Sequence, residues 1–202
     1  MKIFERMIFG DEKLAVDWDN VVVWSTIPTL KLSFRKCGKI YYPHTGWNFE
    51  NYEENGDTDV IAEYMRLTQG KTMVPVKLCD ERIPYYMNEG LKQGKLIVTT
   101  ARPQHLHKGT LIEGRKLGVL VTDGTLFCTN KDGMFYKSKP EAMRAHNCTR
   151  LIDDGDHNVQ AALDAGFKAT LISHPETSWN LANAHKYECK KDLISVFKEY
   201  VK

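Results

Sequence analysis

The chain of 202 residues has the length of one domain with an insertion, and two small domains of equal size fit this length less well. Hydrophobic residues make up 42% of the sequence and charged residues 27%, which allows a buried core and excludes a wholly disordered chain. The net charge of +2 gives no electrostatic argument for binding to nucleic acid or to an anionic membrane surface.

The cysteines and the apolar runs favour a cytoplasmic protein without a membrane partner. No two cysteines have CxxC spacing and their number is odd, which argues against a zinc ribbon or a disulfide scaffold; they are Cys37, Cys79, Cys128, Cys148 and Cys189. No apolar stretch approaches the roughly 18 residues that cross a membrane. Glu5 lies where a secretory signal would need an apolar segment.

Three short apolar runs predict parallel strands whose ends carry carboxylates or hydroxyls. The runs and the polar residues after them are 14–16 with Asp17 and Asp19, 96–98 with Thr99 and Thr100, and 151–152 with Asp153 and Asp154. In parallel sheets, ligands bind outside the carboxyl ends of the strands. We therefore predict an α/β fold in which these side chains line one acidic pocket.

Between residues 25 and about 78 the periodic pattern of a core unit is lost. A long segment of this kind is usually functional or disordered, and its aromatic content argues against disorder. We predict a small cap over 25–78, inserted into a core formed by residues 1–24 and 79–202. Its aromatic residues, Tyr42 and Trp47 among them, either contact a substrate or form the cap's own core.

The rest of the pattern predicts alternating helices and strands. Helices are expected over 80–93, from Pro140 onward, over 158–165 and over 193–201, and strands over 95–99 and 169–172. Residues 105–136 are ambiguous, with two candidate hairpin turns at 122–125 and 131–134.

Asp17 and Asp19 lie two residues apart after a strand, so both carboxylates can face one pocket. Two carboxylates this close raise each other's pKa unless a divalent cation or a lysine balances them. Hard oxygen ligands with room for water and phosphate favour Mg²⁺. The alternative is an ordinary turn at a strand end, and this pair alone does not decide between the two.

A second acidic group follows the run at 151–152; it comprises Asp153, Asp154, Asp156 and Asn158. One such residue is enough to cap a helix, and burying all of them without a cation would be costly. Lys139, with Lys137 as a competitor, could supply positive charge from a helix start, although either could be a solvated surface lysine.

Four segments resemble, in order, the motifs of haloacid dehalogenase-like (HAD) phosphohydrolases. They are Asp17-Trp18-Asp19-Asn20-Val21-Val22, Leu96-Ile97-Val98-Thr99, Lys139-Pro140 and the stretch from Asp153 to Asn158. The pattern covers about residues 13–23 and 90–175. Asn20 stands where the family usually has glycine. Asp123-Gly124-Thr125 mimics the first motif but lacks the preceding aspartate, so we predict a plain turn there.

The resemblance implies a Rossmann-like parallel sheet and hydrolysis of phosphate monoesters through an aspartyl phosphate. Asp17 would be the nucleophile, and Asp19 would protonate the leaving oxygen and then activate water. The phosphoryl oxygens would be held by Thr99, Thr100 and Lys139. The Mg²⁺ ligands would be Asp17, the carbonyl oxygen of Asp19 and Asp154, supported by Asp153 and Asn158.

A loose resemblance to small 5′-nucleotidases of the superfamily makes a nucleoside monophosphate the expected substrate, with Arg102, Tyr42 and Trp47 as candidate contacts. Three alternatives stay open: a phosphatase acting on a nucleic-acid end or a phosphoprotein, a phosphomutase, and a non-catalytic binding protein on this fold. The near-neutral charge argues against a nucleic-acid end. The oligomeric state does not follow from the sequence.

Overall fold

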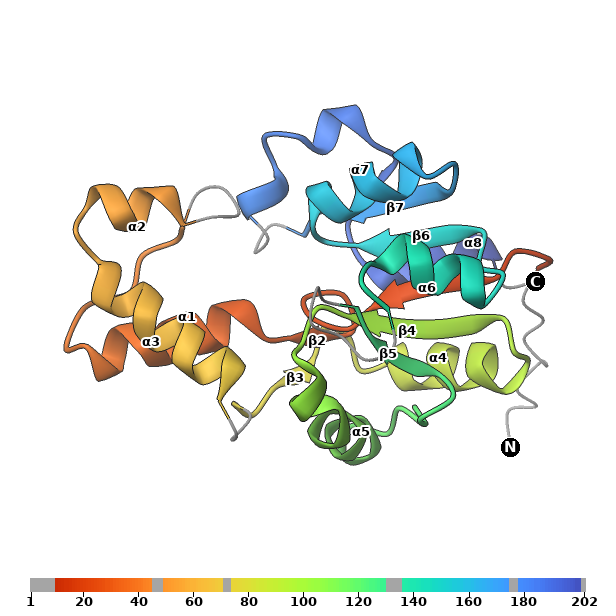
Figure 1. Cartoon of the computed structure of the whole chain (residues 1–202), viewed down its shortest axis with the longest axis horizontal. Helices are drawn as coiled ribbons and strands as arrows, with labels where there is room; N and C mark the ends of the chain where they lie inside the picture. Colours follow the sequence, from red (N-terminus) through yellow and green to blue (C-terminus); the bar gives the residue numbers. More distant parts are fainter. Residues whose placement is uncertain (1–9, 45–48, 71–73, 130–135, 175–177, 201–202) are drawn as a thin grey trace.

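The core strands form one parallel sheet. In the computed structural model, which describes residues 10–44, 49–70, 74–129, 136–174 and 178–200, six strands are hydrogen-bonded in the order β5-β4-β1-β6-β7-β8 (Figure 1). Their bounds are β1 (Leu14–Asp17), β4 (Leu96–Thr100), β5 (Leu126–Cys128), β6 (Arg150–Asp153), β7 (Lys168–Ile172) and β8 (Cys189–Lys190). The Rossmann-like parallel sheet expected from the sequence is thus confirmed.

Helices cover both faces of this sheet, as a parallel sheet requires. One face carries α4 (Ile83–Lys92), α5 (His107–Lys116) and α8 (Leu193–Tyr200), and the other carries α6 (Lys139–Ala145) and α7 (Asp156–Asp164). Short 3₁₀ helices follow some of the strands in the described residues: η1 (Gln104–Leu106), η2 (Ser178–Asn180) and η3 (Ala184–Lys186).

Alternate side chains of the central strands enter the two cores on either face. Val16 of β1 packs with α4, α5 and α8, whereas its neighbour Ala15 packs with α6 and α7. Successive side chains of a strand point to opposite faces, so Asp17 follows Ala15 toward α6 and α7. Thr99 is the register partner of Asp17, and Asp153 follows the α6 and α7 side of β6. The fold thereby aims three polar strand ends at one pair of helices.

The inserted segment is helical and has its own core. It contains α1 (Thr26–Lys36), α2 (Glu50–Glu54) and α3 (Thr58–Gln69), which lie beside the sheet layers in Figure 1. Its buried core comprises Leu30, Phe34, Tyr52 and Val60. At its base, β2 (Val23–Trp24) pairs antiparallel with β3 (Lys77–Leu78). The helices were not predicted, and the cap boundaries at 25 and 78 stay a prediction.

Tyr42 belongs to this helical core. Its ring packs edge-on against Phe34 and Tyr52, and its hydroxyl donates a hydrogen bond to Asp57 Oδ2 at 2.5 Å. Because the side chain is occupied in this way, the structure gives no support to the expected substrate contact of Tyr42. Trp47, the other aromatic candidate, lies outside the described residues.

Two expectations for the core need correction. Helix α4 begins at Ile83, with Arg82 as the N-cap residue in place of the expected Asp80, and the Asp80 carboxylate accepts a hydrogen bond from the Arg82 N–H (2.8 Å) in the turn before the helix. Helix α5 was missed, since Gly109 and Gly114 weaken its helical pattern.

The turn expected at 122–125 is present, with the Thr125 N–H bonded to the Thr122 carbonyl oxygen at 3.0 Å. It leads into β5, which runs parallel to β4, so it does not form a hairpin. The adjacent Asp123 is exposed and pairs with His107 Nε2 at 3.0 Å. The second candidate turn, at 131–134, lies outside the described residues.

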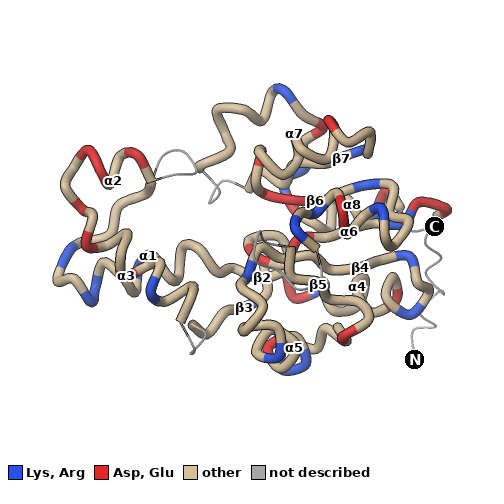
Figure 2. The backbone as a smooth tube through the Cα atoms, in the orientation of Figure 1, with Lys and Arg blue, Asp and Glu red and all other residues tan. Residues whose placement is uncertain are grey.

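Charged residues of both signs are spread along the whole backbone in Figure 2, in keeping with the small net charge. In the described part of the chain, no helix is both long enough and apolar enough to cross a membrane.

The core of the insert should depend on Phe34. This ring is 1% exposed and meets Tyr41, Tyr42 and Tyr52 edge-on. We expect Phe34→Ala to lower the free energy of unfolding of the insert by roughly 3–5 kcal/mol in urea titrations. Ile40→Ala, in the same insert but at a side chain that is 91% exposed, should change it by less than about 0.5 kcal/mol. Equal effects of the two changes would contradict this packing.

Candidate active site

Three buried carboxylates meet at the carboxyl edge of the sheet. Asp17 ends β1, Asp153 ends β6 and Asp154 follows it, and one oxygen of each lies within 4.8 Å of the others. Lys139 Nζ lies 2.7 Å from Asp17 Oδ1 and 2.5 Å from Asp153 Oδ2. It is the first residue of α6, which Ser138 caps by accepting a hydrogen bond from the Glu141 N–H. The sequence prediction of one acidic cluster at the strand ends therefore matches the geometry.

Lys139, and not Lys137, is the lysine of this cluster. The Lys139 side chain is 3% exposed, whereas Lys137 is exposed to solvent. Burial alone would lower the pKa of Lys139, but the carboxylates of Asp153 and Asp17 outweigh it and raise the pKa. The ammonium group is therefore charged.

The cluster carries more negative charge than Lys139 balances. Burial raises the pKa of Asp17 from 3.8 to about 7, although Lys139 opposes the shift, and Asp153 and Asp19 add to it. Burial, together with Asp17 and Asp153, also raises the pKa of Asp154 well above its ordinary value. A set of hard oxygen donors with excess negative charge is what a divalent cation such as Mg²⁺ requires, so these residues fit such an ion.

Asn20 shapes the turn between the strand and the insert. It has φ of 58° and is 3% exposed, and asparagine tolerates this left-handed conformation better than most residues other than glycine. Its Nδ2 donates to Thr26 Oγ1 (2.8 Å) and Asp154 Oδ2 (3.1 Å), and its Oδ1 accepts from the Thr26 N–H (3.0 Å). Asparagine in place of the usual glycine thus links the turn to the acidic cluster.

The residues after β6 hold Asp153 and Asp154 in place. Asp153 Oδ1 accepts hydrogen bonds from the Gly155 N–H (2.9 Å) and from Asn158 Nδ2 (3.1 Å). Asn158 is thus hydrogen-bonded to a member of the carboxylate cluster, and its supporting role in Mg²⁺ binding stays a prediction. Asn180 was not predicted; its Nδ2 donates to the Asp154 carbonyl oxygen at 2.7 Å.

The two threonines at the end of β4 have different surroundings because they face opposite sides of the sheet. Thr99 is wholly buried on the side of Asp17, and its Oγ1 has no hydrogen-bond partner among the described residues. Thr100 Oγ1 donates to Asp19 Oδ2 and accepts from the Arg102 N–H, both at 3.1 Å. Only Thr99 thus has an unused hydroxyl on the side of the cluster.

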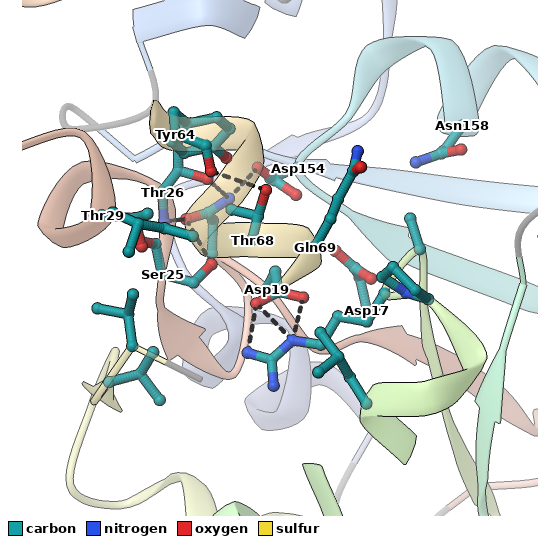
Figure 3. Close-up of a pocket in the computed structure, with 18 of the residues that line it drawn as sticks. Asp17, Asp19, Ser25, Thr26, Thr29, Tyr64, Thr68, Gln69, Asp154 and Asn158 are labelled. Carbon is teal, nitrogen blue, oxygen red and sulfur yellow. Dashed lines mark hydrogen bonds and ion pairs between the residues drawn. The ribbon is translucent and has the colours of Figure 1, made fainter. Parts of the chain in front are cut away.

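The Asp19 carboxylate faces Arg102 rather than the three clustered carboxylates. Arg102 Nη2 lies 2.7 Å from Oδ1 and Nε lies 2.9 Å from Oδ2, and dashed lines in Figure 3 mark this ion pair at Asp19. Burial would raise the pKa of Asp19, but Arg102 outweighs it and lowers the pKa. Arg102 lines the cavity while its guanidinium binds protein carboxylates, and the expected substrate contact of Arg102 stays a prediction.

A cavity of about 1040 Å³ lies between this acidic site and the insert. Figure 3 shows Asp17, Asp19 and Asp154 among the side chains that line it. Neutral polar side chains of the insert also line it, namely Ser25, Thr26, Thr29, Tyr64, Thr68 and Gln69. His105 Nε2 lies 3.0 Å from the Gln69 carbonyl oxygen and joins the core to α3. Tyr42 is not among the residues that line the cavity.

No protein-family model matches the sequence, and no curated protein matches it. Solved structures resemble the fold over nearly the whole chain. A protein from Clostridium acetobutylicum described as a predicted phosphatase is 18% identical with a TM-score of 0.58, over 93% of this chain and 97% of its own. A haloacid dehalogenase-like hydrolase from Streptococcus pneumoniae is 12% identical with a TM-score of 0.58, over 94% and 98%.

A proposed beta-phosphoglucomutase from Thermotoga maritima is 16% identical with a TM-score of 0.52, over 93% of this chain and 99% of its own. At these identities the likeness concerns the fold, which is that of the HAD hydrolases. The neighbours include both hydrolases and a mutase, so the reaction has to be argued from the site.

Substitutions of Asn20 should lower the stability of the protein both through backbone strain and through lost hydrogen bonds. Asn20→Gly loses the bonds to Thr26 and Asp154 but keeps the left-handed turn, whereas Asn20→Ala must also adopt φ of 58°. We expect the alanine variant to be less stable than the glycine variant by about 1 kcal/mol in urea unfolding.

Asn147 is the matched control, since it has φ of 55° at an exposed position. Its alanine and glycine variants should differ in the free energy of unfolding by the same amount as those of Asn20. Asn147→Gly should lower the free energy of unfolding less than Asn20→Gly does. Equal costs of the two glycine variants would mean that the Asn20 side chain contributes nothing beyond its backbone conformation.

Proposed function

We propose that the protein is a Mg²⁺-dependent phosphatase that hydrolyses a phosphate monoester through a phosphoryl group carried on Asp17. The observation that carries the proposal is the buried cluster of Asp17, Asp153, Asp154 and Lys139, which borders the cavity at the carboxyl edge of the sheet. Phosphoryl transfer depends mainly on positioning and on charge stabilisation, and this cluster offers both.

In the first step, an Asp17 carboxylate oxygen forms a bond to phosphorus while the bond to the ester oxygen breaks. Asp19, two residues along, protonates the departing oxygen; because Arg102 lowers the pKa of Asp19, the proton that Asp19 passes on comes from the monoanionic phosphate of the substrate. In the second step, water attacks the phosphorus of the aspartyl phosphate and gives a proton to Asp19. The bond between phosphorus and the Asp17 oxygen breaks, so phosphate is released and the Asp17 carboxylate is restored. Lys139 would stabilise charge on the phosphoryl oxygens, and the buried Thr99 hydroxyl has a free hydrogen to donate to one of them.

The cluster fits a bound Mg²⁺. Asp17 and Asp154 would supply carboxylate ligands and Asp19 its backbone carbonyl oxygen, while Asp153 keeps Lys139 in place. When bound, Mg²⁺ would neutralise charge on the carboxylates and on the phosphoryl group. Burial of Asp17, together with the nearby Asp153 and Asp19, raises its pKa and supports this assignment, because a bound cation would compensate for both effects.

For the substrate we propose a nucleoside monophosphate. The cavity is large enough for a small ligand, and the insert lines it with hydroxyl and amide groups that suit the sugar of a nucleoside. Tyr64, on α3, adds a ring that could contact a base. A nucleic-acid end or a phosphoprotein would have to enter a cavity that the insert and the core both line, which favours a small substrate.

Phosphate release from a panel of esters tests the activity. The panel contains 5′- and 3′-nucleotides, sugar phosphates and an aryl phosphate, each with Mg²⁺ or with a chelator. We expect Mg²⁺-dependent release, with 5′-nucleotides preferred, and a loss of at least about 10³-fold in Asp17→Asn. Asp123→Asn, at the exposed turn that mimics the first motif, should behave as wild type. Undiminished turnover by Asp17→Asn would contradict the mechanism.

Metal binding is tested separately by thermal unfolding with Mg²⁺ or chelator. The pKa of Asp17 is raised in the folded state, so the metal-free protein loses stability as the pH rises from about 4 through about 7. Protons compete with Mg²⁺ for Asp17 below about pH 7. We therefore expect Mg²⁺ to raise Tm more at pH 8 than at pH 5.5.

Asp154→Asn should abolish most of that rise in Tm. Asp156→Asn should keep it, because Asp156 Oδ2 accepts a hydrogen bond from Asn183 and lies outside the cluster. A rise in Tm that is the same in wild type and in Asp154→Asn would show that Mg²⁺ binds elsewhere.

A further inference from the structure

The Asp19 carboxylate is the end point of a chain of contacts that begins in the core. Arg102 binds both of its oxygens, and Arg102 Nη1 in turn lies 2.5 Å from Glu113 Oε2 and 3.2 Å from Thr110 Oγ1. Glu113 Oε2 also accepts a hydrogen bond from Trp18 Nε1 at 3.4 Å. The chain therefore returns to Trp18, the residue between the two aspartates of the proposed reaction.

The guanidinium of Arg102 is well suited to fix a carboxylate. Its planar fork matches both oxygens of Asp19, which a lysine ammonium could not do. The side chains of Arg102 and Glu113 are only 11% and 12% exposed. A buried cation between two carboxylates is held strongly, because each charge would be costly if it lost its partner.

Helix α5, which carries Thr110 and Glu113, is packed tightly against Trp18. A Cβ built on Gly114 would lie 2.6 Å from Val121 Cγ2 and 3.4 Å from the Trp18 ring, so only glycine lets the helix approach this closely. Trp18 is itself wholly buried. The origin of the chain of contacts is therefore a rigid part of the core.

We propose that Arg102 and Glu113 are positioning residues that hold the Asp19 carboxylate at the wall of the cavity for proton transfer. The inference rests on the proposed function and extends it to two residues outside the four motifs. Glu113 is not among the residues that line the cavity, and Arg102 does line it but directs its guanidinium at protein side chains. The contacts argue against a direct substrate role for Arg102, because its guanidinium is directed at Asp19, Glu113 and Thr110.

Proton transfer from Asp19 matters more for some esters than for others. An alkyl phosphate has a poor leaving group whose oxygen needs the proton as the bond to phosphorus breaks. An aryl phosphate has a good leaving group that can depart as the anion. A residue that acts through Asp19 should therefore affect kcat/KM for an alkyl ester far more than for an aryl ester.

A double-mutant cycle between Asp19 and Arg102 tests this, with an alkyl and an aryl phosphate as substrates and Mg²⁺ present. We expect Arg102→Ala to lower kcat/KM for the alkyl ester by about a hundredfold and for the aryl ester by less than about fivefold. In the Asp19→Asn background, Arg102→Ala should cause no further loss beyond about twofold, because its partner is already removed. Arg102→Lys and Glu113→Gln should show the same ester dependence with smaller losses.

Arg115→Ala is the matched control, since Arg115 lies on α5 but is exposed, and it should behave as wild type. The positioning role would be overturned if Arg102→Ala lowered kcat/KM as much in the Asp19→Asn background as in wild type, or if it lowered kcat/KM equally for both esters. If Arg102→Ala does not fold, Arg102→Lys and Glu113→Gln in both backgrounds decide by the same criteria. A wild-type protein that hydrolyses neither ester would overturn the proposed function, and the proposal with it.

Discussion

The structure depends on one electrostatic constraint: three carboxylates and one ammonium group are buried together where the central strands end. Burying ions is costly unless partners compensate for the lost hydration. Lys139 compensates for part of the charge, and hydrogen bonds from Asn20, Asn158 and the Gly155 N–H satisfy further oxygens. The remaining negative charge destabilises the fold unless protons or a cation bind. A fold that keeps such a cluster is therefore organised for a ligand and not for stability alone.

The parallel sheet makes this cluster possible because successive side chains of each strand point to opposite faces. The acidic cluster therefore lies on one face and the packing of Trp18 on the other. Asp17, Thr99 and Asp153 face α6, which supplies Lys139. Trp18 packs in the core on the face of α4, α5 and α8, and the hydrogen bonds of Thr100 lead to Asp19 and Arg102. Asp17 is thus held by Lys139 of α6, whereas Asp19 is held by Arg102, which Glu113 of α5 binds in turn.

Sequence reasoning located the strand ends and their acidic residues, where the signal is local, and missed contacts between residues far apart in the chain. Buried parallel strands are short apolar runs, and the polar residues after Val16, Val98 and Ile152 mark their ends directly. The insert does carry a helical signal, since Leu30 and Phe34 are four residues apart, but its many aromatic residues and glycines obscured it. The contact between Arg102 and Asp19 joins residues 83 positions apart, and the local sequence around neither residue predicts it.

The claim at the centre of this account is that Asp17 carries the phosphoryl group. The most direct test is to quench the protein during turnover of an aryl phosphate and to map the modified residue by mass spectrometry, with Asp17→Asn as the control. The account predicts one phosphoryl group on the peptide that contains Asp17, and none in the variant. Phosphate release with the phosphoryl group on another residue would contradict it.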